Sequence, residues 1–385
     1  MESIAEVEKL NKILIYNFFP PSSLGAIQRV ENVTIRELTG EQRRQLIDTQ
    51  QVYEAWLSAD EERQRRFAGS MRWGNRNGVD YLLRKIGQVE TSLGPRGEQT
   101  EKAFTAFVEG RERNKDLLAG LASRLDDLAR INVAMRLGRV PVIAARILRR
   151  CAETGLLGRQ LFVVGTNSLF AYETLAGVQF TSDFTATGDI DLLYDCRRRI
   201  SFVTAEKINQ SGLIGLLRKV DQSFKPLQPR AFRAVNRDGY LVDLIRPWAK
   251  NELANKASTS ITSIPDDLDG APIEGLQWLI NAPKVDSIAI DERGYPVRIL
   301  TVDPRVFAVH KAWLAKQSGR PALKSTRDRD QSVAVAQITR RYLGLPLDSE
   351  YLAKIPVPLR EAAISTLSPV DPSPTSDEPS IRPNW

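Results

Sequence analysis

Two long stretches in the first third of the chain carry hydrophobic residues at helical spacing. Residues 39–66 are rich in charged side chains and predict one helix. Residues 98–137 predict the clearest helix of the chain, because leucines recur at intervals of three and four positions with charged residues between them. These leucines are Leu117, Leu118, Leu121, Leu125 and Leu128. We expect this helix to serve in packing or to form one half of an antiparallel hairpin.

Glycine, asparagine and proline interrupt the chain between these two helices. Residues 71–78 and 92–97 contain several of these residues and therefore predict loops. The short apolar segment 79–86 between the loops predicts a strand. A further helix is expected to begin at Pro141, because proline is well tolerated in the first turn of a helix.

Between residues 161 and 245 the pattern changes to short apolar strands separated by turns and helices. The expected strands are 161–164, 190–194, 232–235 and 240–245, and the expected helices are 168–175 and 204–217. The dipeptide Asp238-Gly239 between the last two strands is typical of a β-hairpin. The alternation predicts a small sheet with helices packed around it.

The remaining segments complete an expected α+β fold. That fold is a small mixed sheet flanked by helices, with a mostly helical N-terminal region and C-terminal helices. The pattern predicts a mixed helix over residues 1–30, a polar loop over 250–272, strands up to about residue 302, and helices from Pro304 and over 327–342. The expected boundaries are 1–140 for the N-terminal region, 141–250 for the core sheet, 251–367 for a strand-plus-helix region and 368–385 for a proline-rich, disordered tail.

Charge is distributed unevenly along the chain. The 385 residues carry a formal net charge of +7, and residues 1–150 hold 25 Lys and Arg against 20 Asp and Glu. The basic excess therefore lies mainly in the N-terminal region. It indicates either an ordinary solvated surface or a region that holds a nucleic-acid acceptor.

The scarcity of cysteine and histidine excludes several classes of site. Cys151 and Cys196 are too few for a disulfide framework or a four-thiolate zinc site. His310 is the single histidine, so histidine-rich metal sites are excluded. The chain begins with a mixed, acidic stretch and contains no apolar run long enough to span a bilayer, so we expect a soluble, cytoplasmic protein without a membrane partner.

A glycine turn and three aspartates then suggest a specific chemistry. The expected strand 161–164 runs into a helix through Gly165 and Thr166, where backbone amides, the helix N-terminus and a hydroxyl can approach a phosphate. Asp189 and Asp191 lie two positions apart on a strand, so their side chains point to the same face. Two carboxylates this close favour a divalent cation, and oxygen-only ligands favour Mg²⁺ or Mn²⁺ over zinc.

Asp243 interrupts a second apolar strand directly after the hairpin turn. A buried carboxylate needs a cation or strong hydrogen-bond donors nearby. If the Asp243 strand lies beside the Asp189 and Asp191 strand, the three acids converge on a site for two metal ions. Asp243 would then act as a base or as a ligand of the second metal.

These residues resemble a known superfamily. Gly165-Thr166, Asp189-x-Asp191 and Asp243 are similar to the signature of the DNA polymerase β-type nucleotidyltransferases, in which serine usually follows the glycine. The residues around them also resemble a little-characterised bacterial family of nucleotidyltransferase-fold proteins. Its further motifs here are residues 92–96, Pro304, Arg305, Phe307, Ala308, His310, Lys311, Lys324, Arg327, Asp328 and Gln331.

The resemblance implies Mg²⁺-dependent transfer of a nucleotidyl group from a nucleoside triphosphate such as ATP. Superfamily members modify RNA ends, proteins and small molecules, and some toxin-like relatives act on tRNA. The nucleotide, the acceptor and any protein partner or antitoxin stay open, and the N-terminal region is the candidate for acceptor selection. Candidate nucleotide-binding residues are Gly165, Thr166, Asn167, Lys311, Lys324 and Arg327.

Two other functions fit the same residues. Clustered aspartates with Mg²⁺ also suit a nuclease, although the phosphate turn ahead of them disfavours it. A non-catalytic nucleic-acid or partner-binding module that retains the fold is the second alternative, supported by the N-terminal charge excess.

Overall fold

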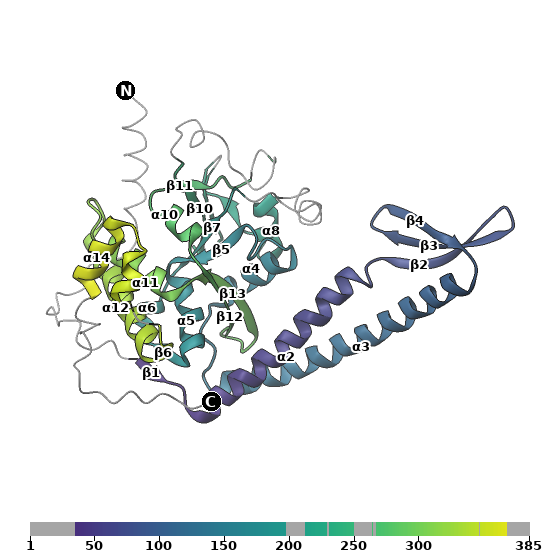
Figure 1. Cartoon of the computed structure of the whole chain (residues 1–385), viewed down its shortest axis with the longest axis horizontal. Helices are drawn as coiled ribbons and strands as arrows, with labels where there is room; N and C mark the ends of the chain where they lie inside the picture. The colour runs from purple at the N-terminus through teal and green to yellow at the C-terminus, as the bar shows by residue number, and fades with distance from the viewer. Residues whose placement is uncertain are drawn as a thin grey trace, which may run out of the picture. The chain divides into compact units, whose positions relative to one another are not determined.

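The fold was taken from a computed structural model, which describes residues 35–197, 212–228, 231–249, 264, 267–345 and 347–367. Contacts within the chain define two compact units. The helical-hairpin unit comprises Leu38–Arg150 and Ile288–Ile299, and the sheet unit comprises the other described residues. Helices and a mixed six-stranded sheet confirm the expected α+β fold (Figure 1).

The six-stranded sheet is the centre of the sheet unit. Its strands run in the order β5-β7-β10-β9-β8, and β11 pairs with the far end of β10. The central neighbours β7 and β10 are parallel, whereas β5 and β9 flank them in antiparallel orientation. The strands are β5 (Leu161–Val164), β7 (Asp189–Tyr194), β8 (Lys225–Pro226), β9 (Arg233–Val235), β10 (Leu241–Pro247) and β11 (Ala271–Ile273).

Helices surround this sheet, and α12 contacts both α5 and α6 near the catalytic candidates. Helix α11 packs against α12 and α14 in the C-terminal part (Figure 1). The helices are η1 (Gly165–Asn167), α5 (Ser168–Ala176), α6 (Ser182–Thr185), α8 (Gly212–Val220), α10 (Leu276–Asn281), α11 (Pro304–Leu314), α12 (Ala322–Arg341), α13 (Ser349–Ala353) and α14 (Val357–Leu367). A short pair, β1 (Ile35–Glu37) and β6 (Val178–Phe180), completes the unit.

The helical-hairpin unit consists of two long helices with a three-stranded sheet between them in the sequence. Thr39 caps α2 (Gly40–Arg65): its hydroxyl accepts a hydrogen bond from the backbone N–H of Gln42 at 3.2 Å. The strands β2 (Ser70–Arg76), β3 (Val79–Ile86) and β4 (Val89–Pro95) form an antiparallel meander, and the chain returns along α3 (Glu98–Ala134) (Figure 1).

The β12–β13 hairpin supplies part of the core of the helical-hairpin unit. Strands β12 (Lys284–Ile290) and β13 (Pro296–Val302) pair with each other, and Ile288 packs with Tyr53 and Leu125. Helix α4 (Val142–Glu153) holds the connecting turn through Arg149, whose guanidinium lies 2.7 Å from the buried Asp291 carboxylate.

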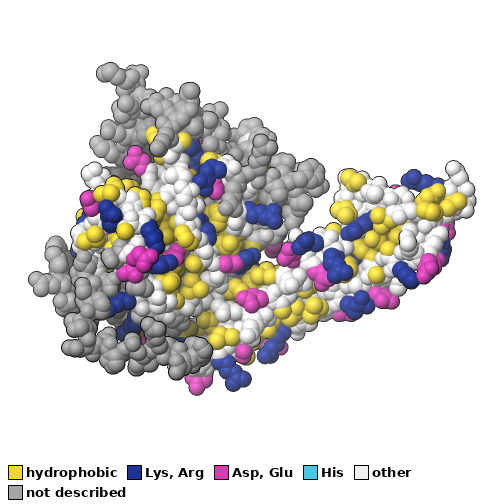
Figure 2. All heavy atoms as spheres, viewed as in Figure 1, with side chains coloured by type: hydrophobic (Ala, Val, Ile, Leu, Met, Phe, Trp, Pro, Cys, Tyr) yellow, Lys and Arg dark blue, Asp and Glu magenta, His cyan; other side chains and the backbone are white. Residues whose placement is uncertain are grey.

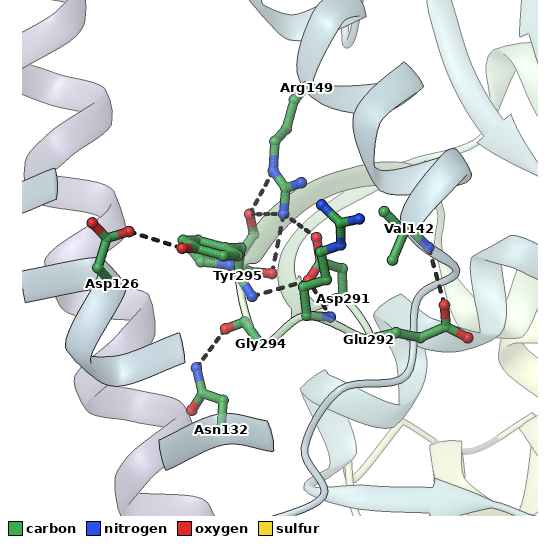
Figure 3. A network of polar contacts seen from close by, with 10 residues as sticks. Asp126, Asn132, Val142, Arg149, Asp291, Glu292, Gly294 and Tyr295 are labelled. Atoms are coloured by element: carbon green, nitrogen blue, oxygen red, sulfur yellow. Dashed lines mark hydrogen bonds and ion pairs between the residues drawn. The ribbon is translucent and has the colours of Figure 1, made fainter. Parts of the chain in front are cut away.

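The same turn is also tied to α3 (Figure 3). Asn132 donates a hydrogen bond to the Gly294 carbonyl at 2.8 Å, and the Tyr295 hydroxyl donates one to Asp126 at 2.9 Å. A side chain at Gly294 would meet the Ala129 backbone oxygen at 2.1 Å, so only glycine allows this approach.

Several elements differ from the sequence expectations. The loops expected at 71–78 and 92–97 are largely the strands β2 and β4, and the turn is confined to Asn77 and Gly78. Antiparallel pairing and the packing of Trp73 on Phe104, with ring centroids 5.7 Å apart, override the local preference for a loop. Gly94, at φ +124°, lies beside the shift in register between β3 and β4.

Other differences lie in the C-terminal part. Strand β11 begins at Ala271, within the last two positions of the expected loop 250–272. Helix α12 begins after Pro321 rather than at residue 327, and α13 and α14 were not expected as separate helices. The expected helix over 1–30, the tail after 367, most of the loop and the first half of the 204–217 helix lie outside the described residues. Where the chain is described, no helix is long and apolar enough to cross a membrane.

Candidate active site

The parallel pairing of β7 with β10 brings the three predicted aspartates to one region of the sheet. Asp191 is the direct neighbour of Asp243, and Asp189 is the neighbour of Leu241. Residues two apart on a strand share a face, so Asp189, Asp191 and Asp243 all point to the same side. Ile190 points to the opposite side, where it is fully buried. Because the apolar side chains of β7 pack into the core on one face of the sheet, the three acids lie together on the opposite face.

The Gly165 turn lies directly against Asp191. Strand β5 pairs with β7 so that Val164 is opposite Asp191, and the next residue, Gly165, turns the chain with a φ of +68°. A Cβ atom at Gly165 would be 2.1 Å from the Asp191 Oδ2 atom. Glycine is therefore required twice here, for the left-handed backbone and for the close approach of the carboxylate.

We expect Gly165→Ala to destabilise the protein more than Gly239→Ala. Both glycines have a positive φ, +68° and +81°, but a Cβ at Gly239 meets no atom within 4 Å. Gly239→Ala should therefore cost only the backbone penalty of about 1–2 kcal/mol, whereas Gly165→Ala adds a clash worth roughly 1–3 kcal/mol more. Urea unfolding of both variants measures the difference. Equal losses of unfolding free energy in the two variants would show that the Asp191 carboxylate moves away from the new Cβ atom at no cost.

Hydrogen bonds hold the strand that carries the acids. The Asn167 side chain donates to the Asp189 carbonyl at 2.7 Å, and the Thr187 hydroxyl donates to the Asp189 carboxylate. Burial, followed by the nearby Asp189 and Asp243 carboxylates, raises the pKa of Asp191 to about 7, against an opposing influence of Lys311 and Arg233. The site therefore concentrates negative charge in a place poorly reached by water.

Asp243 has a partner that the sequence reasoning did not identify. Arg233, on β9, donates to both carboxylate oxygens of Asp243, from Nε at 2.6 Å and from Nη2 at 2.5 Å. Burial still raises the pKa of Asp243, although this hydrogen-bonded guanidinium opposes the rise. The hairpin register could have revealed Arg233, because counting back from the Asp238-Gly239 turn places it opposite Asp243.

The acids are not arranged as a ready metal site. In the part of the chain that the structure describes, no group of three or more His, Cys, Asp or Glu side chains is positioned to hold a metal ion. Other partners hold two of the acids, since Arg233 binds both oxygens of Asp243 and Thr187 binds Asp189. Asp189 and Asp191 nevertheless offer hard oxygen donors whose mutual repulsion a cation would relieve.

Lys311 is buried in an ion-pair cluster rather than extended into solvent. Its Nζ atom lies 2.6 Å from the Asp328 carboxylate, and Arg320 lies 2.5 Å from the other oxygen of the same group. Asp328 is thus a buried anion shared by two cations, and it does not cap α12, which begins at Ala322. Lys311 is close enough to Asp191 to lower its pKa.

The other two predicted basic residues lie on the first turns of α12. Lys324 is exposed, and its charge opposes the rise in the pKa of Asp243. Arg327 donates a hydrogen bond to the Ala186 carbonyl, in the segment that leads into β7. Lys324 is therefore the cation of the two that is free to approach an incoming anion from solvent.

Aromatic and basic residues of the helical-hairpin unit have structural partners. Trp73 is covered by Phe104 and by the Arg96 guanidinium, 5.1 Å from the ring centroid. Surface cations there pair with nearby acids, as in Arg63–Asp60 at 2.5 Å and Lys102–Glu98 at 2.5 Å. Basic and acidic side chains accordingly alternate along the visible face of the helices (Figure 2).

The single histidine is part of the core. His310 packs between Trp278 and Trp313, with ring centroids 6.3 and 5.7 Å away. Burial lowers its pKa to about 3, so it stays neutral at physiological pH. Its buried Nε2 atom has no hydrogen-bond partner among the described residues, so it activates no nucleophile of the Ser-His-Asp kind there.

Residues 143–355, more than half of the chain, match a family profile described as Nucleotidyltransferase. The chain belongs to this nucleotidyltransferase family. The matched segment contains the Gly165 turn, all three aspartates and the basic residues of α11 and α12. It excludes α2, α3 and the small sheet between them. No curated protein and no solved structure matches this chain.

Proposed function

We propose that the protein transfers a nucleoside monophosphate from a nucleoside triphosphate to an acceptor hydroxyl with the help of Mg²⁺ or Mn²⁺. The observation that carries the proposal is the pairing of Asp191 with Asp243 on parallel neighbouring strands, with Gly165 in contact with Asp191. Family membership supports the same class of chemistry.

Each residue has a role in this proposal. Asp189 and Asp191 would hold the cation, which supplies positive charge to the phosphates and to the attacking oxygen. The Gly165 amide and the Thr166 hydroxyl would donate to phosphate oxygens at the start of α5. Lys324 would attract the triphosphate from solvent.

Asp243 would take part only after leaving Arg233. As a base or as a ligand of a second cation, it needs at least one of the oxygens that Arg233 now binds. The buried Lys311 would act on the nucleotide through the electrostatic potential of its charge and not through direct contact, because its ammonium is paired with Asp328 at 2.6 Å. Nucleotide and cation binding would thus rearrange the Asp243–Arg233 pair.

The test is the transfer of label from α-labelled nucleoside triphosphates, each of the four in turn, to components of a total cell extract. With Mg²⁺ we expect one fraction to gain label, and EDTA should abolish the gain. RNA, protein and small molecules are separated before counting, which identifies the acceptor class. If RNA is labelled, rising salt should weaken the labelling.

Other results would identify the alternatives. Shortening of RNA or DNA without any triphosphate would indicate a nuclease. Binding of RNA or of a protein without label from any of the four nucleotides would indicate a non-catalytic module. Each result is incompatible with nucleotidyl transfer by this site.

A further inference from the structure

Helix α12 reaches the phosphate turn through a single buried side chain, Gln331. Its Nε2 atom donates to the Phe184 carbonyl at 2.8 Å and to the Thr166 hydroxyl oxygen at 3.3 Å. Gln331 is completely buried, and it joins two segments far away in the sequence, the turn after β5 and the segment before β7.

The Phe184 carbonyl fixes the orientation of the Gln331 amide. A carbonyl oxygen can only accept, so the NH₂ group must face Phe184. The second hydrogen of the same NH₂ group then points at Thr166, whose oxygen accepts it. The Thr166 hydroxyl keeps its own proton, and no described residue accepts a hydrogen bond from it. The Thr166 hydroxyl can therefore donate its hydrogen bond to a ligand.

The rest of α12 holds Gln331 in this place. Asp328, one turn earlier, is fixed by Lys311, and Ser332 donates to the Ala308 carbonyl at 2.6 Å. Arg327 binds the Ala186 carbonyl in the same segment as Phe184. Gln331 is therefore anchored on both sides, through its helix and through its amide.

Packing alone does not account for a glutamine at this position. The Oε1 atom of Gln331 is buried, and no described residue donates to it. A buried acceptor without a partner is unfavourable, so the position bears this cost in exchange for the two hydrogen bonds that the amide donates to Phe184 and Thr166.

We propose that Gln331 is a positioning residue, which directs the Thr166 hydroxyl to donate to a phosphate oxygen of the nucleoside triphosphate. The inference rests on the proposed function, since it needs a nucleotide at the Gly165 turn. Gln331 itself touches no substrate and acts only through Thr166. A donor fixed in advance loses less conformational freedom when the ligand binds.

The test is a double-mutant cycle with Gln331→Met and Thr166→Val. We expect each single variant to raise KM for the nucleoside triphosphate about three- to tenfold, with a smaller change in kcat. The double variant should be no worse than Thr166→Val alone, because both changes remove the same hydrogen bond. Gln331→Glu should bind the triphosphate more weakly than Gln331→Met does, because a carboxylate would accept the hydrogen bond of the Thr166 hydroxyl and would repel the triphosphate.

Gln337→Met is the matched control, since Gln337 is half-buried on the same helix. It should leave KM unchanged. Calorimetric titration with a non-hydrolysable triphosphate and Mg²⁺ gives affinities independent of turnover, and circular dichroism melting monitors folding. Independent effects of the two changes, or a Gln331→Met variant with wild-type KM, would overturn the positioning role while leaving the proposed function intact. A wild-type protein that neither binds the triphosphate nor transfers label would overturn both.

Discussion

Asp191→Asn is expected to lower nucleotidyl transfer at least about a thousandfold, since losing a cation ligand removes several kcal/mol of transition-state stabilisation. Asp191 is the acid in direct contact with Gly165 and opposite Asp243, so it is central to the proposed site. Asparagine has the same size, so the loss reports on charge rather than on packing. Initial rates of label transfer with saturating Mg²⁺ measure it.

The same substitution should stabilise the protein when no metal is present. The Asp191 pKa is raised to about 7 from 3.8, so the folded state keeps this proton while the unfolded state loses it. Stability therefore falls as pH rises from about 4 to about 7, and the penalty persists above that range. Asparagine carries no such penalty, and the advantage of Asp191→Asn in EDTA should grow over this pH window.

Asp238→Asn is the control for both measurements. Asp238 is exposed in the hairpin turn that precedes β10, and its carboxylate lies 3.8 Å from the exposed Arg237. It should change neither transfer nor the pH dependence of stability. Full activity of Asp191→Asn would rule out Asp191 as a metal ligand, and a parallel pH profile for the two variants would contradict its raised pKa.

Asp328→Asn is expected to destabilise the sheet unit strongly, by about 3 kcal/mol or more. The Asp328 side chain is 3% exposed and pairs with Lys311 and Arg320, whose side chains are 10% and 29% exposed. Removing the anion leaves the Lys311 charge buried without compensation. Denaturant unfolding in urea gives the loss in free energy.

An exposed pair on α3 provides the comparison. Asp127 lies 3.4 Å from Arg130, and the two side chains are 53% and 78% exposed. Asp127→Asn should therefore cost no more than about 1 kcal/mol, since water and salt screen such pairs. Equal losses for Asp328→Asn and Asp127→Asn would mean that Lys311 finds another partner after the substitution.

The sequence predicted the strands of the site well, because their signals are local. The apolar runs of β5, β7 and β10 fall where expected, and the Asp238-Gly239 turn pairs β9 with β10. The sequence alone did not show that Asp191 lies beside Asp243, because the order of parallel strands in a sheet depends on distant segments of the chain.

The side-chain partners could not be predicted in the same way. Gln331 meets Thr166 across 165 positions of sequence, and no periodicity encodes such a contact. Lys311 was a candidate for binding the triphosphate, and its pairing with Asp328 at 2.6 Å was not predicted. The strands β2 and β4 escaped prediction because their glycines and asparagine resemble a loop until α3 and β3 pack against them.

The two units are interleaved along the chain, and this has a consequence for synthesis on the ribosome. The helices α2 and α3 emerge early, but Ile288, which packs with Tyr53 and Leu125, emerges only after most of the sheet unit. At bacterial or eukaryotic elongation rates the delay is on the order of ten to thirty seconds. During that time Tyr53 and Leu125 lack their contact with Ile288, so this part of the core of the helical-hairpin unit is completed only late in synthesis.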